Sequence, residues 1–193
     1  SYTMLAADRG SEISFTTAGV TLNLLAAASA GNGALLAIRN AAATGDITLD
    51  PAGAETLDGL VTKLLRPGDN VLIRSDGVNW RTVSGTYSFE SAEQTMALST
   101  VNTVAHGLGV KPNFLRAVYR CKTTENGWAV GDEIEAGATQ STYGRAFGAD
   151  ATNCVHTNQQ TYAWYLGNKT TGAGAALSYA NWKLVFYAKD IRG

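Results

Sequence analysis

The chain contains 193 residues, of which 45% are hydrophobic and only 16% are charged, and its formal net charge is −1. Its length accommodates one or two domains, and its near-neutral charge provides no basic stripe of the kind that nucleic-acid binding requires. No apolar run approaches the roughly 20 residues of a membrane-spanning helix, so we expect neither nucleic-acid binding nor membrane insertion. Because an average chain carries about a quarter charged residues, this shortfall suggests surface hidden in an oligomer.

Short strands separated by turns are predicted from the beginning of the chain. Apolar and polar residues alternate in several runs, which is the period of a half-buried strand. The strand candidates in this part lie at residues 2–7, 13–17, 20–24 and 35–39. Residues 26–30 favour a helix by propensity, but Gly31-Asn32-Gly33 ends it at once.

The stretch from Gly45 to Trp80 organises the first half of the chain. Asp50-Pro51-Ala52-Gly53 and Pro67-Gly68-Asp69-Asn70 are turn sequences, because proline presets φ and glycine supplies a positive φ. Asp76-Gly77 is a strong hairpin signal. A helix cannot pass through these breakers, and the runs between them have the length of strands. We predict that Trp80 is buried beneath these strands.

A domain boundary is predicted near Ser84-Gly85, after which further strand candidates follow. The longest of them lie at residues 114–123, 161–166 and 182–189. About a dozen short strands without a convincing helix predict an all-β fold with two consecutive antiparallel β-sandwich or β-barrel-like modules. We assign residues 1–84 to a proximal module and residues 85–193 to a distal β-sandwich module.

The two cysteines, Cys121 and Cys154, do not make a disulfide framework. Two free buried thiols are the favoured interpretation in a reducing cytoplasm, and a pair across neighbouring strands stays open. His106 lies in a Gly-rich loop and could ligate a metal on a three-fold axis, but a histidine bonded to the backbone is the favoured interpretation. Cys154 and His156 share a strand face, and two ligands do not make a metal site.

Catalytic motifs are absent from the sequence, which has no GxSxG, HExxH, P-loop or GxGxxG. Glycosidases need two carboxylates about 5 to 10 Å apart, and Glu133 and Glu135 would share a strand face near the lower end of that range. A solvated acidic strand end is the favoured interpretation of these two residues. We therefore expect no enzymatic activity, no catalytic residue, no metal and no cofactor.

Several motifs occur along the chain: AADRG at Ala6–Gly10, AGNG at Ala30–Gly33, Arg39-Asn40, the segments Thr48–Gly59 and Pro67–Val83, the long segment Ala105–Glu135 and the closing segment Tyr179–Asp190. These motifs resemble those of phage tail-fibre and virion spike proteins, a family that includes head spikes and phage-like gene-transfer particles. The first half resembles a module common in these proteins, and the second half resembles their receptor-facing tip domains.

The resemblance implies a homotrimer on the virion surface of a phage or phage-like particle that is assembled in the bacterial cytoplasm. It also implies host-cell attachment by binding a cell-surface polysaccharide, with the N-terminal module docked to other virion proteins. A structural capsid decoration or fibre connector without receptor binding is the alternative, and a glycan-cleaving spike is a third hypothesis.

Aromatic side chains concentrate in the second half of the chain, where they fit sugar recognition. Sugar C–H faces stack on rings, while hydroxyl groups seek paired donors and acceptors. We expect Tyr119 and Trp182 to belong to the core or to an oligomer interface. Loops on a rigid sandwich commonly carry binding. The ligand-binding candidates are Tyr143, Arg145, Trp164 and Tyr165.

Overall fold

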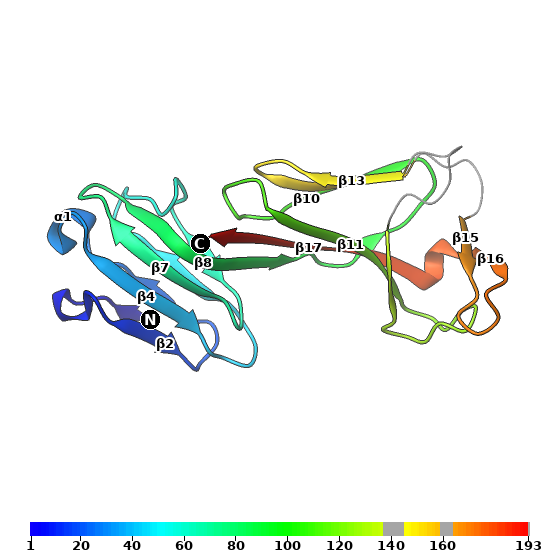
Figure 1. The fold of residues 1–193 in the computed structure, drawn as a ribbon, viewed down its shortest axis with the longest axis horizontal. Helices are drawn as coiled ribbons and strands as arrows, with labels where there is room; N and C mark the ends of the chain where they lie inside the picture. Colours follow the sequence, from blue (N-terminus) through cyan, green and yellow to red (C-terminus); the bar gives the residue numbers. More distant parts are fainter. Residues whose placement is uncertain (137–144, 159–163, 193) are drawn as a thin grey trace. The chain divides into compact units, whose positions relative to one another are not determined.

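The computed structural model of the chain describes residues 1–136, 145–158 and 164–192. Strands account for 51% of the described residues and helix for 6%, so the prediction of an all-β fold is confirmed. No helix within the described ranges has the length and hydropathy needed to cross a bilayer. The chain divides into two compact units (Figure 1). Unit 1 comprises Ser1–Phe89, Gly107–Phe114 and Lys189–Gly193, and unit 2 comprises Glu90–His106 and Leu115–Ala188.

The predicted boundary residues, Ser84 and Gly85, lie inside the continuous strand β8 (Trp80–Glu90). Gly85 has a φ of +124°, and a Cβ added there would lie 2.2 Å from the carbonyl oxygen of Asn70. The glycine is therefore needed for the close approach of two strands, and the chain has no linker at this point. Independent folding of residues 1–84 and 85–193 stays a prediction.

Unit 1 contains two groups of strands that the chain builds alternately. One sheet has the order β1-β3-β5-β6, and the second group has the order β2-β4-β7-β8. Their bounds are β1 Tyr2–Thr3, β3 Thr21–Asn23, β5 Ile47–Asp50 and β6 Lys63–Leu65, then β2 Glu12–Phe15, β4 Leu35–Asn40, β7 Asn70–Ser75 and β8. Two short helices accompany them, the 3₁₀ helix η1 (Ala6–Asp8) and α1 (Ala27–Ala30).

The prediction of purely antiparallel modules is wrong for unit 1. Strands β1, β3 and β5 pair in parallel, and β2 pairs with β4 in parallel. The reason is that the chain changes sheet after each of its first strands, so successive strands of one sheet run in the same direction. The antiparallel pairs are β5–β6, β4–β7 and the β7–β8 hairpin at Asp76-Gly77, as that turn sequence predicts.

The core of unit 1 lies between these two groups of strands. Alternate residues of β4 and β5 are buried, as in the pairs Leu36 with Ile38 and Ile47 with Leu49. The predicted burial of Trp80 is confirmed, since its side chain is 0% exposed and its Nε1 donates to the carbonyl of Leu25. The predicted end of the helix at Gly31 is also confirmed, because α1 stops at Ala30.

A largely buried group of four charged side chains links the early part of unit 1 to its segment from Lys189 onward. The ammonium of Lys63 lies 2.8 Å from Asp58 and 4.0 Å from Asp190, and its side chain is 1% exposed. Arg192 pairs with the same two carboxylates, at 3.1 Å from Asp58 and 2.8 Å from Asp190. The ammonium also lies 3.6 Å from the ring centroid of Tyr87. The charges of two cations and two anions therefore cancel inside unit 1.

The pKa values of Lys63 and Asp58 follow from this environment. Burial lowers the pKa of Lys63, and the hydrogen bond to Asp58 offsets part of that shift. Burial on its own would raise the pKa of Asp58, but the bonds that it accepts from Lys63 and Thr82 outweigh burial and lower the value to about 2. Asp58 is consequently ionised in the folded chain at any pH above that value.

We expect Asp58→Asn to lower the free energy of unfolding by about 3 kcal/mol, because it removes a counter-charge from a buried ammonium. The ordinary pKa of Asp58 is 3.8, and the folded value is about 2. The stabilisation by Asp58 is thus complete above pH 3.8 and is lost as the pH falls toward 2. Urea unfolding across this pH window should show a steeper loss in the original chain than in the variant.

Asp46→Asn is the matched control, because Asp46 makes no side-chain hydrogen bond or ion pair with the described residues. It should leave the free energy of unfolding and its pH dependence nearly unchanged. Equal stability of the Asp58 and Asp46 variants would show that the buried charges contribute nothing.

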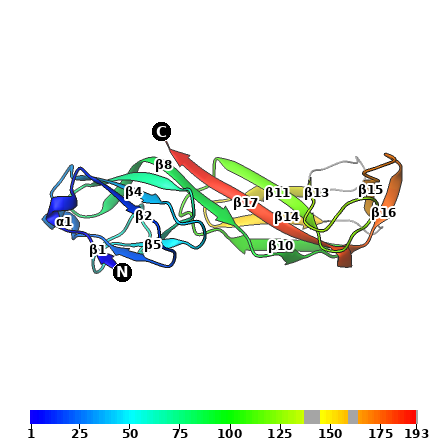
Figure 2. The same cartoon turned by 90° about the horizontal axis from the view of Figure 1, so that it is seen from below.

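Unit 2 contains three groups of strands. The neighbours β12-β11-β17, with β9 beside β17, belong to the same eight-stranded sheet as β8, β7, β4 and β2. A separate sheet has the order β10-β14-β13, and β15 pairs with β16 (Figures 1 and 2). The strands are β9 Gln94–Thr95, β10 Thr100–Ala105, β11 Phe114–Cys121, β12 Glu133–Glu135, β13 Arg145–Ala149, β14 Asn153–Asn158, β15 Trp164–Gly167, β16 Gly174–Leu177 and β17 Trp182–Arg192. The 3₁₀ helix η2 (Tyr179–Asn181) precedes β17.

The interior of unit 2 contains the aromatic residues that we expected there. Tyr119 is 2% exposed and Trp182 is 0% exposed. Both cysteines are buried free thiols, as favoured from the sequence. Burial raises the pKa of Cys154 to about 11, which makes its thiol unreactive at neutral pH.

Candidate functional site

Of the four predicted ligand-binding residues, one can be described with its side chain. Tyr165 lies in β15 with 69% of its surface exposed. Arg145 begins β13 and Trp164 begins β15, and only their backbone positions belong to the described structure. Tyr143 lies outside the described residues. The site can therefore be built from Tyr165 and from the side chains that hold its hairpin.

The β15–β16 hairpin is tied to the turn at residues 125–128. Trp128 Nε1 donates to the carbonyl of Gly167 at 3.1 Å, and the Asn126 amide donates to the carbonyl of Ala176 at 3.1 Å. Both strands of the hairpin are thus held from one turn. Gly127 in that turn has a φ of +80°, and an added Cβ would lie 2.9 Å from Thr170 Oγ1, so the close approach depends on glycine.

The same turn is anchored to the core. Glu125 accepts hydrogen bonds from the backbone N–H of Ser178 and from Trp182 Nε1, at 3.0 and 2.7 Å. The rings of Trp128 and Trp182 pack edge to face with their centroids 6.4 Å apart. A buried tryptophan thereby supports a half-buried one, which in turn holds the hairpin that carries Tyr165.

Charged groups of both signs lie beside Trp128. The ammonium of Lys169 is 5.2 Å from the centroid of the Trp128 ring and 2.5 Å from the carboxylate of Asp132. The hydrogen bond from Lys169 is the main cause of a lowered pKa at Asp132. Ring, ammonium and carboxylate together offer a stacking face, donors and an acceptor, which are the groups that sugars need.

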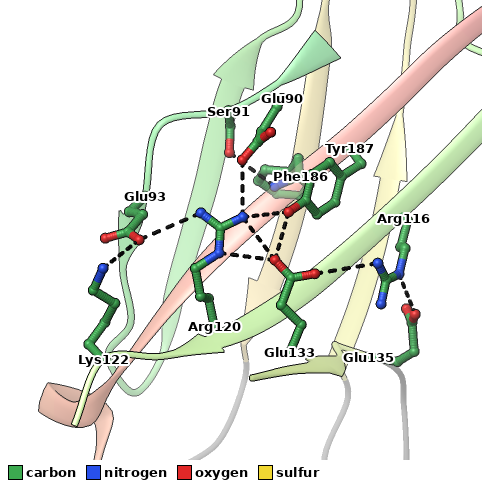
Figure 3. Close-up of polar contacts among 10 residues, drawn as sticks. All are labelled: Glu90, Ser91, Glu93, Arg116, Arg120, Lys122, Glu133, Glu135, Phe186 and Tyr187. Carbon is green, nitrogen blue, oxygen red and sulfur yellow. Dashed lines mark hydrogen bonds and ion pairs between the residues drawn. The ribbon is translucent and has the colours of Figure 1, made fainter. Parts of the chain in front are cut away.

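A second cluster, the Arg120 network, lies on the sheet formed by β11, β12 and β17 (Figure 3). The Arg120 guanidinium contacts Glu133 at 2.8 Å, Glu90 at 3.0 Å and the hydroxyl of Tyr187. Tyr187 donates to Glu133 at 2.6 Å. Every group in this cluster is hydrogen-bonded to another, so the sheet face is fixed before any ligand arrives.

Arg116 extends the network along β11. Its guanidinium pairs with Glu135 at 2.5 Å and with Glu133 at 3.4 Å (Figure 3). The expectation of a solvated acidic strand end is therefore wrong for Glu133, whose side chain is only 21% exposed. Burial would raise its pKa, but the bonds from Tyr187 and Arg120 outweigh it and lower the pKa. A carboxyl held ionised in this way is poorly suited to act as a general acid.

The pairing of these charges is a feature that the sequence shows only in part. Arg116 and Arg120 share one face of β11, and Glu133 and Glu135 share one face of β12. Two alternating runs of opposite charge are visible in the sequence, but nothing in it reveals that the two strands are neighbours. The antiparallel register, which places Arg120 opposite Glu133, brings the charges together.

The histidines have partners within the fold. His106 Nε2 is 3.2 Å from the carbonyl oxygen of Asp150, which agrees with the favoured interpretation of a backbone-bonded loop residue. His156 Nε2 is 2.9 Å from the hydroxyl of Tyr119. In the ranges that the structure describes, no three His, Cys, Asp or Glu side chains are grouped so as to hold a metal ion.

We expect Arg120→Gln to lower the free energy of unfolding by about 1 to 3 kcal/mol, because Arg120 is partly buried and its replacement removes charge-assisted hydrogen bonds to Glu133 and Glu90. Arg116→Gln removes the same charge from a more exposed position, 39% against 23%, and should cost less than about 1 kcal/mol. Chemical denaturation of both variants gives the comparison. Equal losses would contradict a special role for Arg120.

Comparisons with protein-family models, with curated proteins and with solved structures found no match to this chain.

Proposed function

We propose that the chain is an attachment protein of a virion or phage-like particle and that unit 2 binds a polysaccharide of the host-cell surface. The observation that carries the proposal is the exposed ring of Tyr165 on an anchored hairpin. Large aromatic side chains are normally buried for their hydrophobic area, and one that is 69% exposed on a fixed element is suited to stacking on a ligand.

The anchoring of the hairpin supports the proposal in energetic terms. A ligand that immobilises a flexible loop loses affinity through the entropy of ordering, whereas a hairpin held at Gly167 and Ala176 is ordered beforehand. The charged pair Lys169–Asp132 lies beside the same turn and adds a donor and an acceptor for hydroxyl groups. The motif resemblance to tail-fibre tip domains supports the same function.

The proposal includes the assembly that the resemblance implies. The chain forms a homotrimer, its N-terminal module docks to other virion proteins, and it performs no catalysis. The low content of charged residues supports an oligomer, because subunit interfaces are depleted in charge.

Tyr165→Ala should weaken binding to extracted host polysaccharide by about 1 to 3 kcal/mol, the range found for loss of one stacking ring. A panel of bacterial strains is first tested for adsorption of the labelled chain, and surface polysaccharide is then extracted from a strain that adsorbs it. Affinity is measured by calorimetry with short fragments, because avidity in a trimer hides part of the loss.

Two control variants accompany this measurement. Tyr165→Phe keeps the ring and should bind nearly as the original chain does, and Val130→Ala shortens another exposed residue of unit 2 and should have no effect. If the chain adsorbs to no strain, the alternative of a structural decoration or connector protein becomes the better description. Release of reducing ends from the polysaccharide would instead support a glycan-cleaving spike.

The trimer has its own test. Light scattering of the purified chain at micromolar concentration should give a mass three times the 20.3 kDa of one chain. A stable monomer at that concentration would contradict the proposed assembly.

A further inference from the structure

The outer face of strands β2, β4, β7 and β8 carries a hollow of about 340 Å³. The strand register places its side chains in rows across the sheet, on the side opposite the buried residues. The central row runs Glu12, Ala37, Leu72 and Ser84. Ala37 and Ser84 are short, so the sheet surface is lowered between the longer side chains around them. The next row contains Ser14, Arg39 and Asn70, of which Arg39 and Asn70 line the hollow.

The polar side chains of the hollow are available to a ligand. In the described part of the chain, Glu12, Arg39, Asn70 and Ser84 have no side-chain hydrogen bond or ion pair. This contrasts with the Arg120 network of unit 2, where each charge is paired. The hollow thus combines a cation, a carboxylate, an amide and a hydroxyl with the apolar side chain of Leu72.

Like charges face each other in the row on the other side of the hollow. Arg74 of β7 lies directly opposite Arg81 of β8. Like charges at opposed positions of an antiparallel pair destabilise a sheet. Asp76 pairs with Arg81 at 3.1 Å, whereas Arg74 has no such partner among the described residues. An anion placed at Arg74 would relieve the repulsion.

The spacing of these rows suits an extended ligand. Alternate residues of a strand are about 7 Å apart, so Arg39 and Arg74 are separated by roughly 13 Å, with the hollow between them. A polymer lying along β7 would cross Asn70, Leu72 and Arg74 in turn. Repeating negative charges on such a polymer could meet Arg39 and Arg74, while the unit between them occupies the hollow.

We propose that this face of unit 1 binds an acidic polysaccharide whose repeating unit carries a carboxylate, as in a uronic acid polymer. One sugar ring occupies the hollow, its hydroxyl groups donate to Glu12 and accept from Asn70, and its C–H face packs on Leu72. Carboxylates of the polymer pair with Arg39 and with the Arg74–Arg81 pair. The site is separate from Tyr165 and does not depend on the function proposed for unit 2.

The composition of the hollow favours a saccharide over a protein partner. The core of a protein interface is depleted in charged residues and rich in aromatic ones. This hollow has no aromatic side chain and carries two charges of opposite sign. Its volume is near the lower limit of the roughly 300–1,000 Å³ of small-molecule sites, which suits one sugar ring.

The test is calorimetry of the whole chain at low salt with three probes of equal length, namely an oligogalacturonide, a neutral malto-oligosaccharide and an oligoglutamate. The oligogalacturonide should bind, and the other two should bind at least roughly tenfold more weakly. Arg39→Gln and Arg74→Gln should each weaken oligogalacturonide binding roughly tenfold, the loss expected for one charge-assisted hydrogen bond.

Three further variants distinguish a specific saccharide site from a surface that merely attracts anions and from the site of unit 2. Lys111→Gln removes one positive charge from another exposed position of unit 1 and should leave affinity unchanged. Glu12→Gln should weaken binding if its carboxylate accepts sugar hydroxyl groups, whereas a surface that merely attracts anions would bind more tightly without it. Tyr165→Ala should leave this affinity unchanged, which separates the site from that of unit 2. Thermal unfolding midpoints confirm that each variant is folded.

The proposal is overturned if no probe binds or if oligoglutamate binds as tightly as the oligogalacturonide. It is also overturned if Glu12→Gln strengthens binding, or if Lys111→Gln weakens binding as much as Arg39→Gln does.

Discussion

The buried ammonium of Lys63 imposes the strongest constraint on this chain. A lysine that is 1% exposed is tolerated only with counter-charges beside it, and these come from Asp58 and Asp190. Arg192 balances the second carboxylate, so the group is neutral as a whole. Because two of the four residues belong to the end of β17, the interior of unit 1 depends on residues that are more than a hundred positions away in the sequence.

Local chemistry explains why turns could be predicted and sheet partners could not. Proline, glycine and the Asp76-Gly77 pair restrict the backbone at their own positions, so they mark turns without reference to the rest of the chain. The parallel pairing of β1, β3 and β5 depends on the chain changing sheet after each strand. A strand in which apolar and polar residues alternate has the same sequence pattern whichever sheet it joins. The sequence therefore does not reveal which strands pair or in which direction. The burial of Trp80, Tyr119 and Trp182 was predictable because large apolar rings rarely stay in water.

The candidate binding surfaces likewise include residues that can be predicted from the sequence and groupings that depend on strand pairing. Tyr165 could be proposed as a binding residue from its residue type alone, and in the structure it is exposed. The Arg120 network and the hollow beside Ala37 arise from register, since they exist only where Glu133 faces Arg120 and where Ala37 lies between Glu12 and Leu72. A shift of one residue in either pairing would send these side chains to the opposite face.

The contribution of residues 189–193 to unit 1 has a consequence for biosynthesis. A domain made only of early residues can fold while the ribosome is still translating the rest of the chain. Unit 1 is not completed in this way, because Asp190 and Arg192 are translated more than a hundred residues after Lys63 and Asp58, with which they form the charged group. A nascent chain that has not yet reached Asp190 would therefore present an incomplete first unit to chaperones and proteases.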